Sequence, residues 1–344
     1  MKKQAVSMRL QSAWFFYMSN NYNGIVNVYK EKGFTSFDVV AKLRGIFGQK
    51  KIGHTGTLDP EAVGVLPICL GNGTKVVELL MDHDKEYVAE LLLGIKTDTQ
   101  DITGEIIKDY PKLDLRTEAK VRDAIMSFVG EQEQVPPMYS ALKVNGQKLC
   151  DLARKGIEVE RKARKIQIYE IAIERIGETE SPVSGVSMKL PLIKMRVHCS
   201  KGTYIRTLCN DIGEKLGVGG TMYSLERTRV GIFGKEDALT LSEILSLKDE
   251  GRLEQIVRPV DGLFPEYPKV KVTDEAISRL ENGNILLEKE LIPFENYVNP
   301  NNAASPQNAV NLQFCVRVYR PDCSFAGIYR KEDGDRYKPE KMFL

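Results

Sequence analysis

The densest group of residues that could do chemistry surrounds Asp59, within the run GHTGTLDPEAVGVLP at residues 53–67. Five glycines fall between residues 53 and 73, too many for a packed helix or strand, so the backbone must turn tightly there. A carboxylate that acts as a nucleophile needs a cation or hydrogen bonds to hold it ionised. Arg206, in the segment KGTYIR at residues 201–206, is the candidate cation.

Asp59 also has a purely structural interpretation. An aspartate followed by Pro60 and then by Glu-Ala-Val is typical of a helix start, with Asp59 as the N-cap. From this fragment alone we favour the helix cap over catalysis. A phosphate-binding loop is excluded, because Gly73-Thr74-Lys75 reverses the Lys-Thr order of that motif and lacks its glycine five residues earlier.

The composition is that of an ordinary globular chain of 344 residues, a length typical of two domains. It is 42% hydrophobic and 28% charged, which argues against a disordered, collagen-like or disulfide-stapled protein. The net charge is only +2, from 49 basic and 47 acidic residues. Any surface for nucleic acid must therefore be a local patch.

Neither a metal site nor a membrane segment is expected. The six cysteines are scattered without a C-x-x-C pair and only three histidines occur, so we predict no metal ligands. Such cysteines are typical of reduced core residues, and we expect a cytoplasmic protein. No stretch approaches the roughly 20 apolar residues that a membrane helix needs, so no membrane partner is expected.

The expected elements indicate an α+β fold. Alternating, β-rich runs predict strands at residues 24–29, 86–93 and 194–199. Apolar spacing predicts helices that begin after Thr35-Ser36 and over residues 117–128 and 203–216. Strands and helices mix without regular βαβ alternation, which favours α+β over a doubly wound sheet.

A second unit is expected from about residue 265. A strand is predicted at 269–272, followed by a short helix that Thr273 can cap. Two β-rich runs between residues 314 and 330 flank Pro321-Asp322 and predict a hairpin. Residues 295–311 hold six asparagines and no basic residue, and are expected to form a solvent loop.

Residues 143–168 carry a local excess of positive charge, with eight lysines and arginines against three acids. Taken alone, this pattern fits a solvated charged face as well as a surface that follows a nucleic-acid backbone. The second interpretation predicts binding that weakens with salt.

Several segments together resemble one known family. The run GHTGTLDPEAVGVLPICLGNGTK at residues 53–75 resembles the signature of the TruB family, the bacterial tRNA pseudouridine-55 synthases. The supporting segments, in the family's order, are Lys30-x-x-Gly33-x-Thr35-Ser36, Lys85-x-Tyr87 with Asp98 and Asp101, PPMYSALK at 136–143, SKGTYIR at 200–206, and Leu225-x-Arg227-Thr228. The resemblance spans roughly residues 24–233, and the C-terminal eighty residues resemble the family's PUA-like RNA-binding module more weakly.

The resemblance implies a role for each matching residue. Asp59 would be the catalytic carboxylate that attacks either the base or the ribose C1′ atom, and Arg206 would pair with it and keep it charged. Tyr87 would stack on the flipped uracil and take part in proton transfer. His54 would support the loop that receives the flipped nucleotide. The residues expected to line or shape the pocket are Lys30, Lys75, Tyr204 and Leu225.

The same resemblance implies the architecture and the partners. We expect a largely antiparallel mixed sheet flanked by helices, in a catalytic domain over residues 23–264. A disordered extension at 1–22 would precede it, and a PUA-like RNA-binding appendage at 265–344 would follow. The substrate would be the T arm of tRNA, with no metal, no cofactor, no obligate protein partner and a monomeric state.

Other interpretations stay open at this point. Separately, Tyr87 fits a packing tyrosine, Arg206 a helix-surface charge and His54 an ordinary loop residue. The chain could be a related synthase that acts on another RNA or needs a guide RNA, or an RNA-binding tRNA chaperone without catalysis. Three positions depart from the family pattern, namely Glu31, Cys150 and Glu226.

Overall fold

A computed structural model describes residues 22–110, 118–181, 189–294, 315–332 and 334–344. The main body of the protein is built on a nine-stranded sheet. Along the main path, its strands are ordered β1 (Gly24–Lys30), β3 (Val63–Leu70), β12 (Gly220–Val230), β4 (Lys85–Leu93), β11 (Lys189–Cys199), β10 (Arg164–Glu180) and β7 (Gly130–Gln134). Two short strands extend it, with β2 (Ile52–His54) paired to β3 and β13 (Phe233–Gly234) paired to β12. The neighbours along the path are antiparallel except β3 and β12.

The parallel pairing of β3 with β12 joins the two halves of this sheet. Only Val63 with Glu226 and Gly64 with Arg227 are in register there. The loop that carries Asp59 leads directly into this junction. The sheet therefore places Asp59 where its two halves meet.

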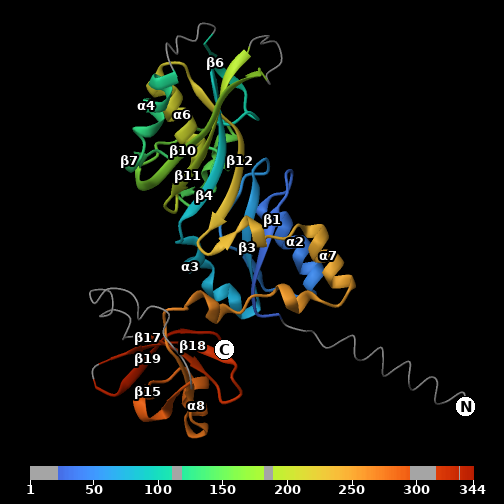
Figure 1. Cartoon of the computed structure of the whole chain (residues 1–344), viewed down its shortest axis with the longest axis vertical. Coiled ribbons are helices and arrows are strands. Elements are labelled where there is room, and N and C mark those ends of the chain that lie inside the picture. The colour runs from blue at the N-terminus through green and yellow to red at the C-terminus, as the bar shows by residue number, and fades with distance from the viewer. Residues whose placement is uncertain (1–21, 111–117, 182–188, 295–314, 333) are drawn as a thin grey trace, which may run out of the picture.

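Helices cover each half separately, as Figure 1 shows. On one half, α2 (Ser36–Phe47) and α7 (Leu241–Asp249) contribute Val40, Leu43 and Ile244 to a core shared with β1 and β3. On the other, α4 (Glu118–Met126) and α6 (Ile205–Leu216) pack against β4, β10 and β11. Helix α3 (Val77–Met81) connects β3 to β4.

Local sequence accounts for the ends of these helices. Helix α2 begins at a capping box in which Thr35 and Asp38 satisfy each other's backbone N–H groups, as Thr35-Ser36 predicted. It ends at Gly48, whose φ of 65° lies in the left-handed region that favours glycine. The strands predicted at 24–29, 86–93 and 194–199 correspond to β1, β4 and the C-terminal part of β11.

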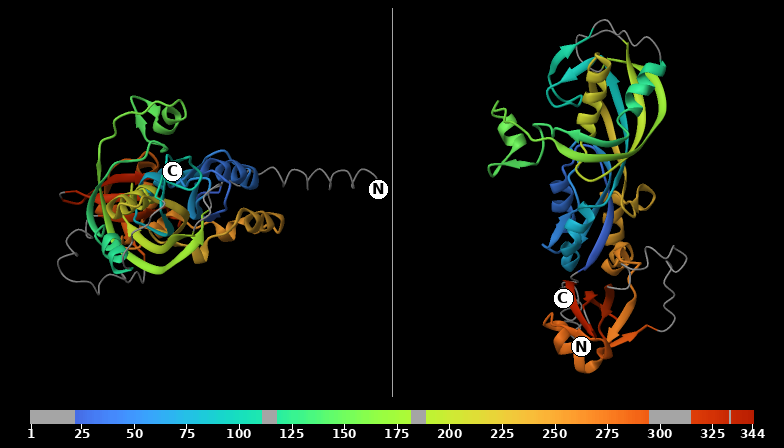
Figure 2. Two further views of the ribbon diagram at one scale, coloured as in Figure 1. Left: turned by 90° about the horizontal axis from the view of Figure 1, so that it is seen from above. Right: turned by 90° about the vertical axis from the view of Figure 1, so that its left-hand side faces the viewer.

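A small arm projects from the side of the sheet between β7 and β10 (Figure 2). It contains a two-stranded hairpin, β8 (Lys143–Val144) with β9 (Gln147–Lys148), and the short helix α5 (Leu149–Ala153). Residues of the basic segment form this arm. A second hairpin, β5 (Ile95–Thr97) with β6 (Ile106–Asp109), follows β4.

The C-terminal part forms a six-stranded sheet of its own. Its strands are β15 (Leu286–Leu287), β19 (Arg336–Met342), β18 (Phe325–Lys331), β17 (Cys315–Tyr319), β14 (Lys269–Val272) and β16 (Leu291–Pro293), in that spatial order. The predicted hairpin is confirmed as β17 and β18, and the short helix is α8 (Ile277–Glu281). Thr273 precedes that region, but its side chain makes no capping hydrogen bond.

The α+β class and the β-rich C-terminal module are thus confirmed, whereas the helix expected after Asp59 is wrong. Asp59 begins a tight turn, in which the Ala62 N–H donates to the Asp59 carbonyl at 3.1 Å, and β3 starts at Val63. Residues 63–70 are almost all buried in the middle of the sheet, and this tertiary burial overrides the local helix signal.

Two expectations concern residues outside the described ranges, namely the extension at 1–22, of which only residue 22 is described, and the whole loop at 295–311. The division at residue 265 stays a prediction. Within the described ranges, no helix is long and apolar enough to cross a membrane.

Candidate active site

The turn that carries Asp59 is fixed on both sides by hydrogen bonds. The Leu58 N–H donates to the Ser36 hydroxyl at 3.0 Å, which ties the turn to the first residue of α2. The Thr55 hydroxyl donates to the Pro67 carbonyl of β3 at 3.1 Å. Leu58 is buried in the core, so the next residue, Asp59, is held at a defined place.

Arg206 meets the Asp59 carboxylate with two nitrogen atoms. Its Nε lies 3.0 Å from Oδ2, and Nη2 donates to Oδ1 at 3.3 Å, the fork geometry of a bidentate pair. The Arg206 side chain, in the first turn of α6, is 6% exposed, whereas that of Asp59 is 37% exposed. The carboxylate is therefore reachable while its cation is not.

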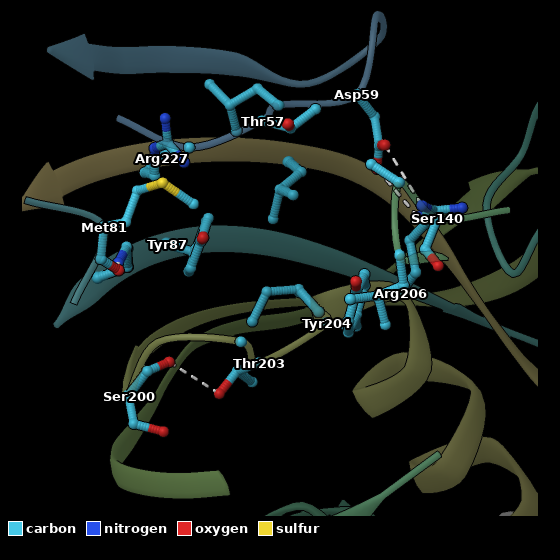
Figure 3. A pocket seen from close by; sticks show the side chains of 18 of the residues that line it. Thr57, Asp59, Met81, Tyr87, Ser140, Ser200, Thr203, Tyr204, Arg206 and Arg227 are labelled. Atoms are coloured by element: carbon cyan, nitrogen blue, oxygen red, sulfur yellow. Dashed lines mark hydrogen bonds and ion pairs between the residues drawn. The ribbon is translucent and has the colours of Figure 1, made fainter. Parts of the chain in front are cut away.

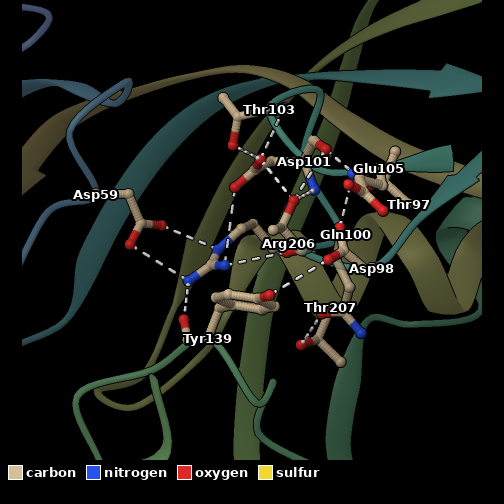
Figure 4. A network of polar contacts seen from close by, with 11 residues as sticks. Asp59, Thr97, Asp98, Gln100, Asp101, Thr103, Glu105, Tyr139, Arg206 and Thr207 are labelled. Carbon is tan, nitrogen blue, oxygen red and sulfur yellow. Dashed lines mark hydrogen bonds and ion pairs between the residues drawn. The ribbon is translucent and has the colours of Figure 1, made fainter. Parts of the chain in front are cut away.

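Further acceptors hold the Arg206 guanidinium in place, as Figure 4 shows. Nη1 donates to the Thr99 carbonyl at 3.0 Å and Nη2 to the Tyr139 carbonyl at 2.7 Å. Asp101 Oδ2 lies 3.7 Å from Nη1, and Asp101 itself accepts from Thr103. The cation is thus positioned by groups outside the ion pair.

Two influences compete over the charge of Asp59. Burial raises the pKa of Asp59 above its ordinary value, and the nearby Asp101 carboxylate acts in the same direction. Arg206, and to a smaller extent Lys30, lower the pKa of Asp59. The ion pair with Arg206 thus favours the charged form against the desolvation of the site.

A cavity of about 380 Å³ opens beside this ion pair (Figure 3). Tyr87, near the start of β4, lies along it and is 9% exposed. Leu225 and Arg227 of β12 and Tyr204 before α6 also line it. The Tyr204 backbone is fixed by Gln134, whose side-chain amide accepts from the Tyr204 N–H at 2.8 Å and donates to its carbonyl at 3.0 Å.

The structure brings five of the eight predicted site residues to the cavity wall: Asp59, Tyr87, Tyr204, Arg206 and Leu225. Two more, His54 and Lys30, lie behind the cavity wall. His54 precedes the lining residue Thr55, its Nδ1 accepts from the Gly56 N–H at 3.4 Å, and burial lowers the pKa of its imidazole.

Lys30 is fully buried and acts on the turn rather than on the cavity. Its ammonium donates to the carbonyls of Glu31, Phe34 and Pro60 at 3.1, 2.6 and 3.1 Å. Burial lowers the pKa of Lys30 to about 8. The lysine therefore fastens the loop after β1 to the residue that follows Asp59.

Lys75 is not brought to the cavity. It lies in the 3₁₀ turn after β3, and its ammonium donates to the Leu344 carbonyl at 3.2 Å. Glu226, which departs from the family pattern, accepts from the Tyr29 hydroxyl at 2.8 Å and pairs with Lys235 at 2.5 Å. The Glu226 carboxylate is thus bound by neighbouring residues of the protein.

Three buried charged residues of the segments that carry the family resemblance have no role assigned from the sequence, namely Lys85, Asp101 and Arg227. Lys85 and Arg227 line the cavity. Arg227 is only 2% exposed, and its Nε donates to the Val65 carbonyl at 2.7 Å. An arginine in the alternating run LERTRV gives no sign of burial in the sequence, because the same pattern fits an exposed edge.

The site offers acid–base and nucleophilic groups but no evident metal ligands. In the described ranges, no group of three or more His, Cys, Asp or Glu residues could hold a metal ion. What the arrangement provides is a partly exposed carboxylate, a fixed cation and an aromatic ring at the wall of one cavity.

Comparisons with known proteins assign this fold to a class. The fold matches that of a solved structure described as "Crystal Structure of a Cbf5-Nop10-Gar1 Complex", with a TM-score of 0.62 and 27% identity, covering 94% of this chain and 85% of the other. A structure described as "Structure of H/ACA RNP bound to a substrate RNA containing 2'-deoxyuridine" shares the fold at a TM-score of 0.61 and 24% identity, covering 96% of this chain and 87% of the other.

Family models narrow the assignment. Residues 44–205 match the model "TruB family pseudouridylate synthase (N terminal domain)", and residues 206–264 match "tRNA pseudouridylate synthase B C-terminal domain". A curated tRNA pseudouridine synthase B of Lachnoclostridium phytofermentans is 50% identical, covering 94% of this chain and all of that protein. The one of Clostridium tetani is 46% identical, covering 90% and 96%. The chain belongs to the TruB family of pseudouridylate synthases.

Proposed function

We propose that this protein isomerises uridine 55 in the T loop of tRNA to pseudouridine, with Asp59 as the nucleophile. The observation that carries the proposal is the bidentate Asp59–Arg206 pair, which presents a partly exposed carboxylate to a cavity bounded by Tyr87. The family assignment supports the reaction, and the relatives named tRNA pseudouridine synthase B support tRNA as substrate.

The reaction needs only what these residues supply. The C1′–N1 bond of uridine breaks, a C1′–C5 bond forms, C5 loses its proton and N1 gains one. Nothing is oxidised and no group is imported, so the balance requires no cofactor. Asp59 attacks either C6 of the base or C1′ of the ribose, and both routes need the ionised carboxylate that Arg206 favours.

The base must leave its stack before it can react. Flipping a nucleotide costs a few kcal/mol, and least where the base already lies in a loop. Stacking on an aromatic ring such as Tyr87 returns about 1–3 kcal/mol. Tyr87 and the aliphatic Leu225 both line the cavity, which gives a planar uracil apolar surface on which to pack.

We infer that the arm between β7 and β10 contributes to binding the tRNA. Its base carries Ser140 and Leu142 to the cavity wall, and the Tyr139 carbonyl accepts from Arg206. Its exposed lysines and arginines are therefore placed beside the site. We propose that a single chain acts without a protein partner, in contrast to the complex with Nop10 and Gar1 that Cbf5 forms.

The decisive experiment compares Asp59→Asn with Glu61→Gln on an unmodified tRNA transcript, using purified protein alone. Glu61 is two residues away, pairs with Lys32 at the surface, and is the matched control for loss of one negative charge. Because Asp59 caps no helix, the amide tests the carboxylate itself. Pseudouridine is mapped by reverse-transcription stops after carbodiimide treatment.

We expect product at the T-loop uridine from the wild type and from Glu61→Gln, and none from Asp59→Asn that still binds tRNA. Equal product from Asp59→Asn would remove Asp59 as nucleophile. If the wild type binds tRNA but makes no product, a chaperone or a guide-dependent synthase takes the place of our proposal.

A further inference from the structure

Arg227 is a buried cation with unused hydrogen-bonding capacity at the cavity. It is 2% exposed, lines the cavity and forms no ion pair with any carboxylate in the described part of the chain. Its Nε donates to the Val65 carbonyl and its guanidinium also interacts with the Tyr87 hydroxyl, but its Nη2 is buried without a hydrogen-bond partner. An arginine stays protonated even when buried, so an uncompensated positive charge lies at this point.

The glycine-containing segment around Asp59 packs closely against Arg227. Gly64, with a φ of +110°, is in register with Arg227, and a Cβ there would lie 2.2 Å from the Arg227 carbonyl oxygen. Gly56 lies next to the guanidinium, since a Cβ at this position would be in ordinary contact with Nη1, at 3.6 Å. Gly64 thus allows β3 to approach the Arg227 backbone closely, and the turn at Gly56 lies beside its side chain.

Neighbouring cations are satisfied, whereas Arg227 keeps a free donor. The Lys85 ammonium donates to the carbonyls of Met81 and His83, and the Lys30 ammonium donates to three carbonyls. The charge of Arg227 contributes to lowering the pKa of Lys30, Lys85 and the His54 imidazole. A buried donor and charge of this kind are stabilised when an anionic or carbonyl oxygen binds.

The proposed reaction places negative charge on a carbonyl oxygen of the uracil, and the uracil is the part of the substrate that would stack on Tyr87. If Asp59 attacks C1′, the C1′–N1 electron pair leaves with the uracil, and its charge spreads to O2 and O4. If Asp59 attacks C6 instead, the electron pair of the C5–C6 double bond moves toward O4. In both orders the uracil ring is negatively charged before C5 bonds to C1′.

We propose that Arg227 is a catalytic residue that binds a carbonyl oxygen of the flipped uracil and stabilises the negative charge that develops on the ring. Arg227 and Tyr87 are direct cross-strand neighbours on β12 and β4, and Figure 3 shows Arg227 near Tyr87 and away from the Asp59–Arg206 pair. The ribose would lie toward Asp59, and the carbonyl edge of the uracil toward Arg227. This inference rests on the proposed function.

The test measures single-turnover pseudouridine formation at saturating enzyme, together with tRNA affinity, for Arg227→Gln and Arg227→Lys. Arg229→Gln is the matched control, because Arg229 is on the same strand but lies near the Glu86 carboxylate at 3.9 Å and is 37% exposed. We expect Arg227→Gln to be roughly 100- to 1,000-fold slower with unchanged tRNA affinity, as for the loss of one oxyanion donor. Arg227→Lys, which keeps the charge, should recover about tenfold or more of that loss.

A rate for Arg227→Gln within about threefold of the wild type would overturn the inference. Equal losses in Arg227→Gln and Arg227→Lys would also overturn it, because they indicate a role of shape alone. If Arg227→Gln does not fold, Arg227→Met, which has an apolar side chain of similar length, takes its place. The wild-type rate distinguishes the two possible failures. A wild type that makes no pseudouridine refutes the proposed function, whereas an active wild type with an equally active Arg227→Gln refutes only the role of Arg227.

Discussion

At the scale of single residues, the chemistry depends on the balance of charges around Asp59. Burial and Asp101 raise the pKa of this carboxyl group, while Arg206 lowers it. Because the proposed nucleophile is the ionised form, activity requires a pH above this raised pKa. Arg206 thus extends the active range downward in pH, and Asp101 helps to hold Arg206 while working against the charge of Asp59.

This balance predicts the pH profile. The acid limb of kcat/KM should lie at a higher pH than the ordinary pKa of an aspartate, about 3.9, because the carboxylate protonates as the pH falls through its raised pKa. In Arg206→Met the lowering influence is lost, so the residual activity should show an acid limb at still higher pH. Arg252→Met, which breaks surface contacts with Glu250 and Gln255 far from Asp59, is the control. An unchanged limb in Arg206→Met would contradict this electrostatic account.

The family resemblance identified the ion pair and the aromatic residue of the site, but the sequence does not show which charged residues the fold buries beside them. Asp59, Tyr87 and Arg206 meet as the family resemblance implied, although they are far apart in the chain. Lys75 belongs to the same motif as Asp59 but turns to the C-terminal residue instead. Arg227 was part of a recognised segment, yet only the register of β12 with β3 and β4 shows that it is buried.

At the scale of elements, the close approach of β3 and β12 requires glycine at position 64. In Gly64→Ala, the new Cβ would lie 2.2 Å from the Arg227 carbonyl oxygen and 2.8 Å from its nitrogen, at a φ of +110°. The two strands must move apart, and we expect a loss of about 1–3 kcal/mol or more in the free energy of unfolding. Activity should fall as well, since the turn of Asp59 leads into this junction.

Gly45→Ala is the opposite case and serves as the control. Gly45 lies within α2 and is exposed, and a Cβ added at this position would meet no neighbouring atom within 4 Å. Alanine there should stabilise the protein by roughly 0.5–1 kcal/mol, because it favours the helix. Chemical denaturation of both variants measures these changes, and a loss of stability in Gly45→Ala would contradict the reasoning.

The elements themselves were predicted unevenly. Helices α2 and α6 and strands β1 and β4 follow from apolar spacing and caps, because their signals are local. The run Asp-Pro-Glu at 59–61 predicts a helix start because it is a strong local cap, whereas the burial of Val63–Leu70 in β3 is a tertiary effect. Strand β12 was not foreseen, because its charged residues Glu226, Arg227 and Arg229 conceal a central strand.

The basic residues of the arm between β7 and β10 lead to a prediction about the salt dependence of tRNA affinity. Lys155 and Lys162 are exposed and form no ion pair within the described residues. If they follow the RNA backbone, each lost phosphate contact should reduce the slope of log affinity against log salt by about 0.7–0.9. The double variant Lys155→Ala/Lys162→Ala is compared with Lys42→Ala/Lys248→Ala on α2 and α7, by tRNA binding at several salt concentrations. Equal slopes in the two variants would leave the arm as a solvated face.

At the scale of the whole molecule, the C-terminal sheet is docked against the main body rather than merely tethered to it. Ile328 and Phe343 share one apolar cluster with Ile25 and Val65 of the main sheet. Arg317 is 4% exposed and its Nε donates to the Tyr267 carbonyl at 2.8 Å, in the segment between the two sheets. The two sheets are therefore expected to lose their structure in a coupled way.

Phe343→Ala tests this coupling. The side chain is 7% exposed, and its ring stacks on that of Phe325 with centroids 5.2 Å apart. Its truncation should cost about 3–5 kcal/mol of the free energy of unfolding, as for other buried aromatic residues. Because the cluster includes β1 and β3, we expect calorimetry to show a lower transition temperature for the whole chain and not only for the C-terminal sheet.

The control is Ile292→Ala, at a position 52% exposed on β16, which should change the free energy of unfolding by less than about 0.5 kcal/mol. A separate early transition in Phe343→Ala, with the main transition unmoved, would instead mean that the C-terminal module folds independently of the site it adjoins.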